Sequence, residues 1–254
     1  MLTSQNMASG NRSDQISTKD VIEGGNVRRI LVVAAHPDDE ILGCGGSIRA
    51  HCTAGHIVRT VIVAQGLTAR GAVSEADLDA HRRAAREANA RLGVDRVVFG
   101  DFPDNAMDTV ALLDVAKFVE AQIHEFQPDT IYTHHPHDLN VDHRVVSQAV
   151  ATACRAQPGI GVDTILFFEV ASSTEWQLDP TGAAFVPNWF VEISPYLDDK
   201  MQALAEYAHE MRPWPHTRSY EAVKHLARWR GATVGVEAAE AFVLARRILR
   251  GKTP

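Results

Sequence analysis

The residue types most suited to chemistry gather in two short stretches of this sequence, and the first is the run HPDDE at residues 36–40. Imidazole and carboxylate groups are typical zinc ligands in proteins. In a turn that opens a helix, residues three apart can face one point, so His36 and Asp39 could hold one metal ion. A polar turn in which Asp38 or Asp39 only caps the helix accounts for the same spacing, and the run alone leaves both interpretations open.

Asp38 stands between the two candidate ligands and would project beside the metal rather than onto it. A carboxylate in that place could act as the general base on a metal-bound water. The metal lowers the pKa of that water from about 16 to about 7, so that hydroxide is available at neutral pH. This arrangement indicates a metal-dependent hydrolase, in which Glu40 has no role beyond opening the helix.

The second stretch, residues 134–143, holds four of the 12 histidines in the chain. His143 lies at the expected start of a helix and could supply a third metal ligand. Three protein ligands leave the fourth position of the ion open for water, which is typical of catalytic rather than structural sites. His135 and His137 could support these ligands or contact the substrate. A surface loop with incidental histidines is the alternative, but four in ten residues make chance a poor explanation.

Each stretch directly follows a predicted strand. Residues 27–35 form a short, continuous apolar run rich in β-branched side chains, as expected of a strand buried on both faces. Strands that alternate with helices indicate an α/β fold with a mainly parallel sheet and helices on both faces. Ligands bind such sheets at the carboxyl ends of the strands, so both stretches are expected to share one site. Further strands are expected at residues 56–64, 96–99, 130–133, 164–170 and 185–193, and helices at residues 47–53, 75–92, 110–126 and 141–154 and within 198–211 and 220–248.

A glycine-rich segment at residues 42–47 follows the first strand. It lacks the GxGxxG spacing of dinucleotide-binding turns and the lysine of phosphate-binding loops, so neither function is favoured. We expect its glycines to allow close backbone approach and tight packing behind the metal site. Cys44 is interpreted as a small packed residue rather than a ligand or nucleophile.

The composition is that of an ordinary globular protein with a sizeable core, since 45% of the 254 residues are apolar and 22% are charged. A formal net charge of −7 argues against a general nucleic-acid binder, which usually carries a basic stripe. Three cysteines, Cys44, Cys52 and Cys154, fit no CxxC zinc pattern and favour a reduced, cytoplasmic setting.

The N-terminal residues 1–26 are rich in Ser, Asn, Gly and Asp and lack the apolar core of a secretory signal. We predict a flexible arm over this segment and one domain over residues 27–254. No run of 18 apolar residues occurs, so no membrane span is predicted.

Both stretches match motifs of a known family. Ala35–Glu40 reads AHPDDE, and His137–Arg144 contains a second motif that ends in Asp-His. On these motifs the chain resembles the LmbE/PIG-L family of zinc-dependent N-acetylglucosamine deacetylases over roughly residues 28–250. The resemblance extends to residues 99–108, 168–176, 215–219 and 230–242.

The resemblance implies a Rossmann-like sheet and a role for each matching position. His36, Asp39 and His143 would bind Zn²⁺, and Asp38 would be the general base. The implied substrate is a small molecule, an N-acetylated amino sugar or its conjugate. Zinc-bound hydroxide would attack the amide carbonyl, zinc and a nearby donor would stabilise the oxyanion, and the base would return its proton to the leaving nitrogen.

One position departs from the family pattern. Many members carry a histidine three residues before the last ligand as a cationic partner for the oxyanion, but this chain has Asn140 there. An amide donates a hydrogen bond but cannot donate a proton. His216 is a candidate replacement, since some relatives complete the site with a histidine from a C-terminal loop, even from a neighbouring subunit; a surface-loop residue is the alternative. Arg82 and Asp104 resemble positions that bind sugar hydroxyls.

Two other functions remain compatible with the sequence. One is a metal-dependent amidase of a non-sugar conjugate, and the other is a sugar- or nucleotide-binding module without catalysis. A binding module has no need of Asp38, which argues against it. Iron or cobalt could occupy the same ligands as zinc. The possible contribution of His216 to a neighbouring subunit makes a homo-oligomer plausible.

Overall fold

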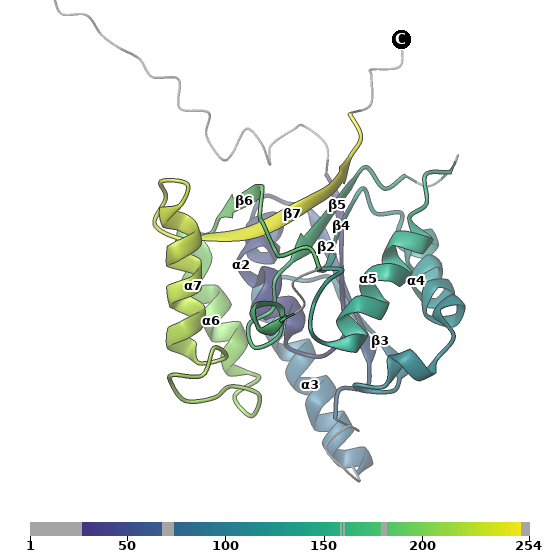
Figure 1. Cartoon of the computed structure of the whole chain (residues 1–254), viewed down its shortest axis with the longest axis horizontal. Helices are drawn as coiled ribbons and strands as arrows, with labels where there is room; N and C mark the ends of the chain where they lie inside the picture. Colours follow the sequence, from purple (N-terminus) through teal and green to yellow (C-terminus); the bar gives the residue numbers. More distant parts are fainter. Residues whose placement is uncertain (1–26, 68–73, 158, 160, 179–181, 250–254) are drawn as a thin grey trace, which may run out of the picture.

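The computed structural model describes residues 27–67, 74–157, 159, 161–178 and 182–249 (Figure 1). The predicted arm over residues 1–26 lies outside these residues. The strands are β1 (Arg29–Ala34), β2 (Ile57–Ala64), β3 (Arg96–Phe102), β4 (Thr130–His134), β5 (Thr164–Phe168), β6 (Trp189–Glu192) and β7 (Ala239–Arg247). The α-helices are α2 (Asp39–Thr53), α3 (Glu75–Leu92), α4 (Leu112–Phe126), α5 (Val141–Ala153), α6 (Leu197–Ala205) and α7 (Tyr220–Ala232).

The seven strands form one sheet in the order β3-β2-β1-β4-β5-β7-β6. Strands β1 to β5 pair in parallel, whereas β7 pairs antiparallel with both β5 and β6. The helices lie on both sides of this sheet, with α4 and α5 on one side and α2, α6 and α7 on the other (Figure 1). The predicted α/β class and mainly parallel sheet are confirmed.

Strand β1 shows why the sheet needs helices on both faces. Its residues from Ile30 to Ala34 are at most 1% exposed. Alternate side chains enter different cores: Ile30 packs in the cluster on the α2 side, and Leu31 packs in the cluster on the α4 and α5 side. This two-sided burial explains the continuous apolar run in the sequence.

The last strand corrects the sequence prediction of helix in the C-terminal region. The helix expected within residues 220–248 ends at Ala232, and Ala239–Arg247 form β7 instead. Alanine, leucine and arginine favour a helix in isolation. Here β7 finds backbone hydrogen-bond partners on both edges, and this tertiary pairing overrides the local preference.

The glycine-rich segment also lies differently from the prediction. Helix α2 begins at Asp39 rather than at Ser47, so the glycines are inside the helix, which is kinked at Cys44 (φ −148°, ψ 24°). A Cβ at Gly43 would lie 2.4 Å from a ring atom of Phe168. The prediction of close backbone approach is therefore confirmed, and Cys44 is fully buried, as expected of a packed residue.

Helix α3 has the boundaries that the sequence predicts. Ser74 and Asp77 form a reciprocal capping box at its start, and Gly93 ends it in the left-handed conformation (φ 91°). Among the described residues, none of the helices combines the length and apolar character needed to cross a membrane.

Candidate metal and catalytic site

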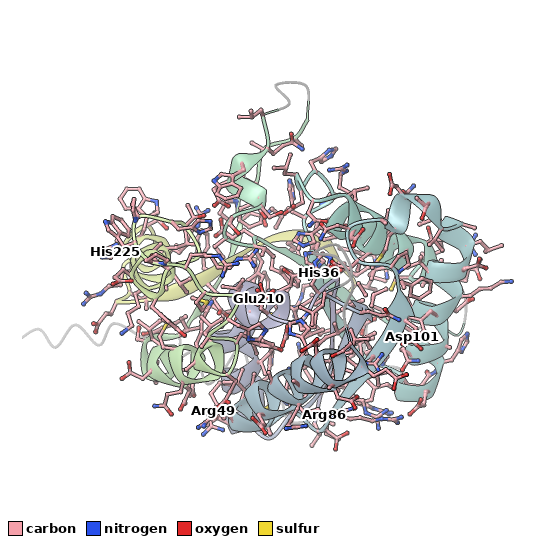
Figure 2. All side chains as sticks on the ribbon, turned by 90° about the horizontal axis from the view of Figure 1, so that it is seen from below. His36, Arg49, Arg86, Asp101, Glu210 and His225 are labelled. Carbon is pink, nitrogen blue, oxygen red and sulfur yellow. The ribbon has the colours of Figure 1, made fainter. Side chains whose placement is uncertain are left out.

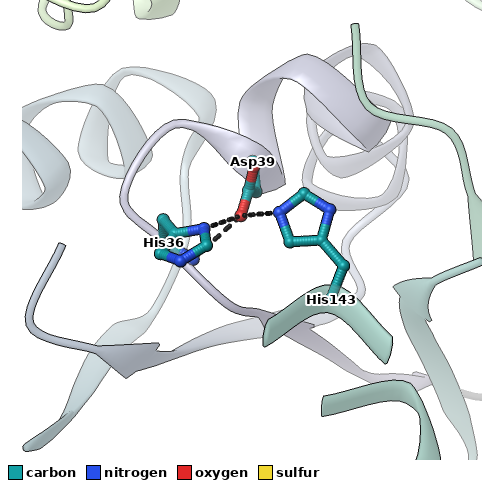
Figure 3. Close-up of side chains that lie close together, drawn as sticks. All are labelled: His36, Asp39 and His143. Atoms are coloured by element: carbon teal, nitrogen blue, oxygen red, sulfur yellow. Dashed lines mark hydrogen bonds and ion pairs between the residues drawn. The ribbon is translucent and has the colours of Figure 1, made fainter. Parts of the chain in front are cut away.

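The two chemical stretches meet because β1 and β4 are adjacent parallel strands. The loops that follow them leave the same edge of the sheet. His36 and Asp39 lie between β1 and the first turn of α2, and His143 lies in the first turn of α5. Each of the three residues offers one candidate ligand atom, and these three atoms lie within 4.8 Å of one another (Figure 3). The structure thus brings together residues that are more than 100 positions apart in the sequence.

One carboxylate oxygen of Asp39 contacts both imidazole rings of this trio. Asp39 Oδ2 lies 3.1 Å from His36 Nδ1 and 3.2 Å from His143 Nε2. Two ligands of a tetrahedral zinc ion lie roughly 3.3 Å apart when each bond is about 2.0–2.1 Å. The observed separations therefore suit three ligands of one ion.

The second nitrogen of each imidazole faces another carboxylate. His36 Nε2 lies 2.9 Å from Asp142 Oδ2, and His143 Nδ1 lies 3.1 Å from Asp138 Oδ1. Asp138 also accepts a hydrogen bond from Thr174 Oγ1 at 2.5 Å. Metal-binding histidines typically donate their other ring nitrogen to a carboxylate, which fixes the ring and strengthens the ligand. Sequence reasoning did not assign this role to Asp138 and Asp142, although both belong to the second motif.

The electrostatics of the trio favour a bound cation. Burial acts to lower the pKa of His36, but hydrogen bonds to Asp142 and Asp39 raise it to about 10. Burial opposes the charge of His143 too, yet the neighbouring Asp39 and Asp138 carboxylates raise its pKa to about 9. Burial also acts to raise the pKa of Asp39, but the charge of His143 holds it well below its usual range. Carboxylates that attract protons onto two buried imidazoles would equally attract a metal ion, so the donor set fits zinc.

Asp38 lies beside the trio in a strained conformation. Its φ of 108° is rare for a residue with a side chain, and it is only 3% exposed. Its backbone N–H donates to Glu40 Oε2 at 3.1 Å. Glu40 in turn accepts hydrogen bonds from Tyr207 Oη at 2.6 Å and Asn89 Nδ2 at 2.8 Å.

The sequence suggested no role for Glu40 beyond opening the helix, but the structure gives it a further one. Its buried carboxylate ties the backbone of Asp38 to α3 and to the chain after α6. Burial raises the pKa of Glu40 to about 7, against the opposing hydrogen bond from Tyr207. No sequence signal distinguishes this role from that of an ordinary acidic residue in a first helical turn.

The Asp38 side chain faces an arginine that sequence reasoning missed. Arg218 Nη1 donates to Asp38 Oδ2 at 3.1 Å, and Arg218 Nε donates to Ser172 Oγ at 2.9 Å. Burial raises the pKa of Asp38 well above its usual range, and the charge of Arg218 acts in the opposite direction. The one available signal was the position of Arg218 in residues 215–219, one of the segments matching the family.

These residues surround one cavity of about 130 Å³. Its wall is mainly polar and combines side chains from both motifs with others from later loops. Three of the predicted substrate and catalytic positions, Asp38, Asp104 and Asn140, are in this wall. The lining residues are His36, Pro37, Asp38, Asp39, Gly66, Asp104, Asn105, Asn140, His143, Ser172, Ser173, Glu210 and Arg218.

Asn140 lines the cavity but is engaged in structural hydrogen bonds. Its Oδ1 accepts from the backbone N–H of Asp142 at 2.8 Å and caps α5, and its Nδ2 donates to Asn105 Oδ1 at 2.9 Å. Asp104 is 6% exposed, and its Oδ1 lies 3.3 Å from His36 Nε2.

Two further predicted positions do not reach this cavity. Arg82 forms an ion pair of 2.7 Å with Asp101, whose exposed side chain lies away from His36 in Figure 2. His216 accepts a hydrogen bond from the backbone N–H of Arg218 at 3.0 Å, and its ring packs against Trp176. Neither side chain lines the cavity of its own chain, and the roles predicted for Arg82 and His216 stay predictions.

Comparisons with known proteins agree with this geometry. The family model described as PIG-L, GlcNAc-PI de-N-acetylase, matches residues 31–154. The chain is 28% identical over 201 residues to the uncharacterized deacetylase YaiS of Escherichia coli K12, covering 76% of this chain and 98% of that protein. It is also 28% identical over 222 residues to the 1D-myo-inositol 2-acetamido-2-deoxy-alpha-D-glucopyranoside deacetylase of Mycolicibacterium vanbaalenii, covering 72% of this chain and 76% of the relative.

A similar fold occurs in GalB, the 4-carboxy-2-hydroxymuconate hydratase of Pseudomonas putida KT2440. The TM-score is 0.70 at 23% identity, with 90% of this chain and 100% of GalB covered. At that identity the likeness shows the fold alone. By sequence, the chain matches the PIG-L (LmbE) family model over residues 31–154, just under half of its length, and is similar to two deacetylase relatives at 28% identity.

Proposed function

We propose that this protein is a zinc-dependent hydrolase that removes the acetyl group from an N-acetylated amino sugar or its conjugate. The observation that carries the proposal is the convergence of His36, Asp39 and His143 on one point, with Asp38 beside them in the same cavity. The names of the family model and of the two deacetylase relatives support the reaction class.

A zinc ion held by the trio would supply Lewis-acid chemistry, lowering the pKa of a bound water to about 7 and polarising an amide carbonyl. Asp38 is the proton acceptor in this proposal. Asp38 lines the cavity beside Asp39, and burial raises the pKa of its carboxyl group well above the usual range. As the C–N bond breaks, the carboxyl group of Asp38 delivers the same proton to the leaving nitrogen.

The cavity wall favours a hydroxyl-rich substrate over an apolar one. Asp104 and Asn105 add polar side chains to the wall next to His36, and the carboxylate of Asp104 can accept hydrogen bonds from hydroxyl groups. A product amine is cationic at neutral pH, and Glu210 adds a further carboxylate to the wall. These side chains support an amino-sugar substrate rather than a long acyl conjugate.

The test is acetate release by the purified, zinc-loaded protein from a panel of N-acetylglucosamine conjugates, with metal content measured on the same sample. We expect one zinc per chain and turnover of at least one conjugate. Stoichiometric zinc with turnover only of non-sugar amides would assign a different amidase. Sugar binding without zinc and without turnover would instead indicate a binding module.

A further inference from the structure

The cavity contains one cationic side chain from outside the two histidine–aspartate motifs. Among the described residues that line it, Arg218 is the only lysine or arginine. We propose that the Arg218 guanidinium is the donor that stabilises the oxyanion when the amide carbonyl becomes tetrahedral. This inference rests on the proposed hydrolysis and assigns a catalytic residue that lies outside the matched family segment, residues 31–154.

The two donors expected from the sequence both have other partners. Asn140 stands where many relatives carry a histidine, but its Nδ2 donates to Asn105 and its Oδ1 caps α5. His216 is not part of the cavity wall and packs against Trp176. Arg218, which donates to Asp38 of the first motif, is the cationic side chain in the wall that can take this role.

Arg218 is held in place from two directions. Its Nη1 donates to Asp38 Oδ2 at 3.1 Å, and its Nε donates to Ser172 Oγ at 2.9 Å. Glu210 Oε2 lies a further 3.7 Å from Nη1. Because a guanidinium carries five N–H groups in one rigid plane, these two hydrogen bonds orient it and leave other N–H groups for a ligand.

The limited exposure of Arg218 strengthens its effect. Its side chain is 22% exposed and the Asp38 side chain is 4% exposed. A donor oriented in advance in such a partly desolvated place stabilises a developing negative charge more than water does. The adjacent Asp38 carboxylate supplies the charge that keeps this guanidinium in position before the substrate binds.

The chemistry divides cleanly between the two side chains. As the water oxygen bonds to the carbonyl carbon, its proton passes to Asp38 and the negative charge moves to the carbonyl oxygen, where Arg218 donates a hydrogen bond. As the C–N bond breaks, the charge returns to re-form the carbonyl and the proton passes from Asp38 to nitrogen. Arginine stays protonated throughout, so Asp38 must carry both proton transfers.

The experiment separates oxyanion binding from support of Asp38. Methylphosphonate, a tetrahedral anion, is titrated into the zinc-loaded protein, its Arg218→Gln variant and the same pair in an Asp38→Asn background. We expect Arg218→Gln to weaken methylphosphonate binding about 10-fold or more in both backgrounds. It should lower kcat about 10²- to 10³-fold with a smaller change in KM. Arg218→Lys should restore part of the methylphosphonate affinity and part of kcat.

Arg212 provides a matched control, because its guanidinium donates to the backbone oxygens of His209 and Met211 outside the cavity wall. Arg212→Gln should change neither the methylphosphonate affinity nor kcat. Zinc content and thermal melting verify that each variant is folded, and Arg218→Met serves if Arg218→Gln does not fold.

Three results overturn the proposal: no methylphosphonate binding by the parent protein, unchanged binding in Arg218→Gln, or an effect that vanishes in the Asp38→Asn background. The last would make Arg218 only a positioning residue. Arg218-dependent methylphosphonate binding without turnover of any amino sugar would reject the proposed substrate and leave the donor role standing.

Discussion

Arg218 Nη1 lies 3.1 Å from Asp38 Oδ2, a contact that joins residues 180 positions apart in the sequence. Asp38 belongs to the first motif, whereas Arg218 lies in the segment between α6 and α7. The C-terminal part of the chain therefore contributes to the same cavity as the motif that identifies the family. Variation in this segment can alter the chemistry of Asp38 without changing any candidate metal ligand.

Replacing Asp38 with asparagine should separate catalysis from metal binding. Asparagine keeps the size of the side chain and can still face Arg218, but it cannot accept the proton of water. We expect kcat to fall about 10²- to 10⁴-fold, as for other general bases, with one zinc per chain retained. Asp101→Asn, at an exposed carboxylate, is the control. Full turnover by Asp38→Asn, measured as acetate release, would exclude it as the base.

Asp138 should set the strength of metal binding without touching the ion. Its Oδ1 lies 3.1 Å from His143 Nδ1, and it is fully buried. Asparagine at position 138 would weaken the interaction with the His143 imidazole, because an amide carries no negative charge. We expect zinc affinity, measured by competition with a chelating dye, to drop about 10- to 100-fold. An affinity equal to that of the parent would show that His143 is oriented by other contacts.

The sequence predicted that the three candidate metal ligands lie together, because each of them follows the carboxyl end of a strand, β1 or β4. Parallel strands place their carboxyl ends together, so His36, Asp39 and His143 could be brought to one edge from the strand pattern alone. Arg218 and Glu40 could not be found in this way. Their roles depend on how loops and helices distant in sequence pack, which no local spacing encodes.

The fold was predictable to the same degree and for the same reason. Local apolar runs and caps predicted the first six strands and most helices, including both ends of α3. The strand at Ala239–Arg247 was not predicted, because the composition of this segment favours a helix. Its structure depends on pairing with β5 and β6. Local periodicity does not predict pairing between strands that are distant in the sequence.

The hydroxyl of Tyr207 should contribute measurably to stability. Tyr207 is fully buried and donates to Glu40 Oε1 at 2.6 Å. Tyr207→Phe would leave the buried carboxylate without this donor, which should lower the free energy of unfolding by about 1–3 kcal/mol. Denaturant titration measures the change, and Tyr220→Phe, at a less buried tyrosine, is the control. An equal loss in both variants would mean that the hydrogen bond to Glu40 has no special weight.

His51, at the opposite end of α2 from the site, should make stability depend on pH. Burial, together with the charges of His56 and Arg28, lowers the pKa of His51 to about 3. Between about pH 6.5 and this value, the unfolded chain binds a proton that the folded chain does not. Stability is therefore lost as the pH falls through that range, by up to about 1.4 kcal/mol per pH unit for one proton.

A neutral replacement isolates this contribution from that of other groups. Glutamine at position 51 can still pair with the hydroxyl of Tyr132, which lies 2.9 Å from His51 Nε2, but it takes up no proton on unfolding. We expect the unfolding free energy of His51→Gln to fall less steeply than that of the parent protein between pH 7 and pH 4. The exposed His124→Gln variant should follow the parent. Parallel curves for His51→Gln and the parent would show that His51 is charged in the folded protein.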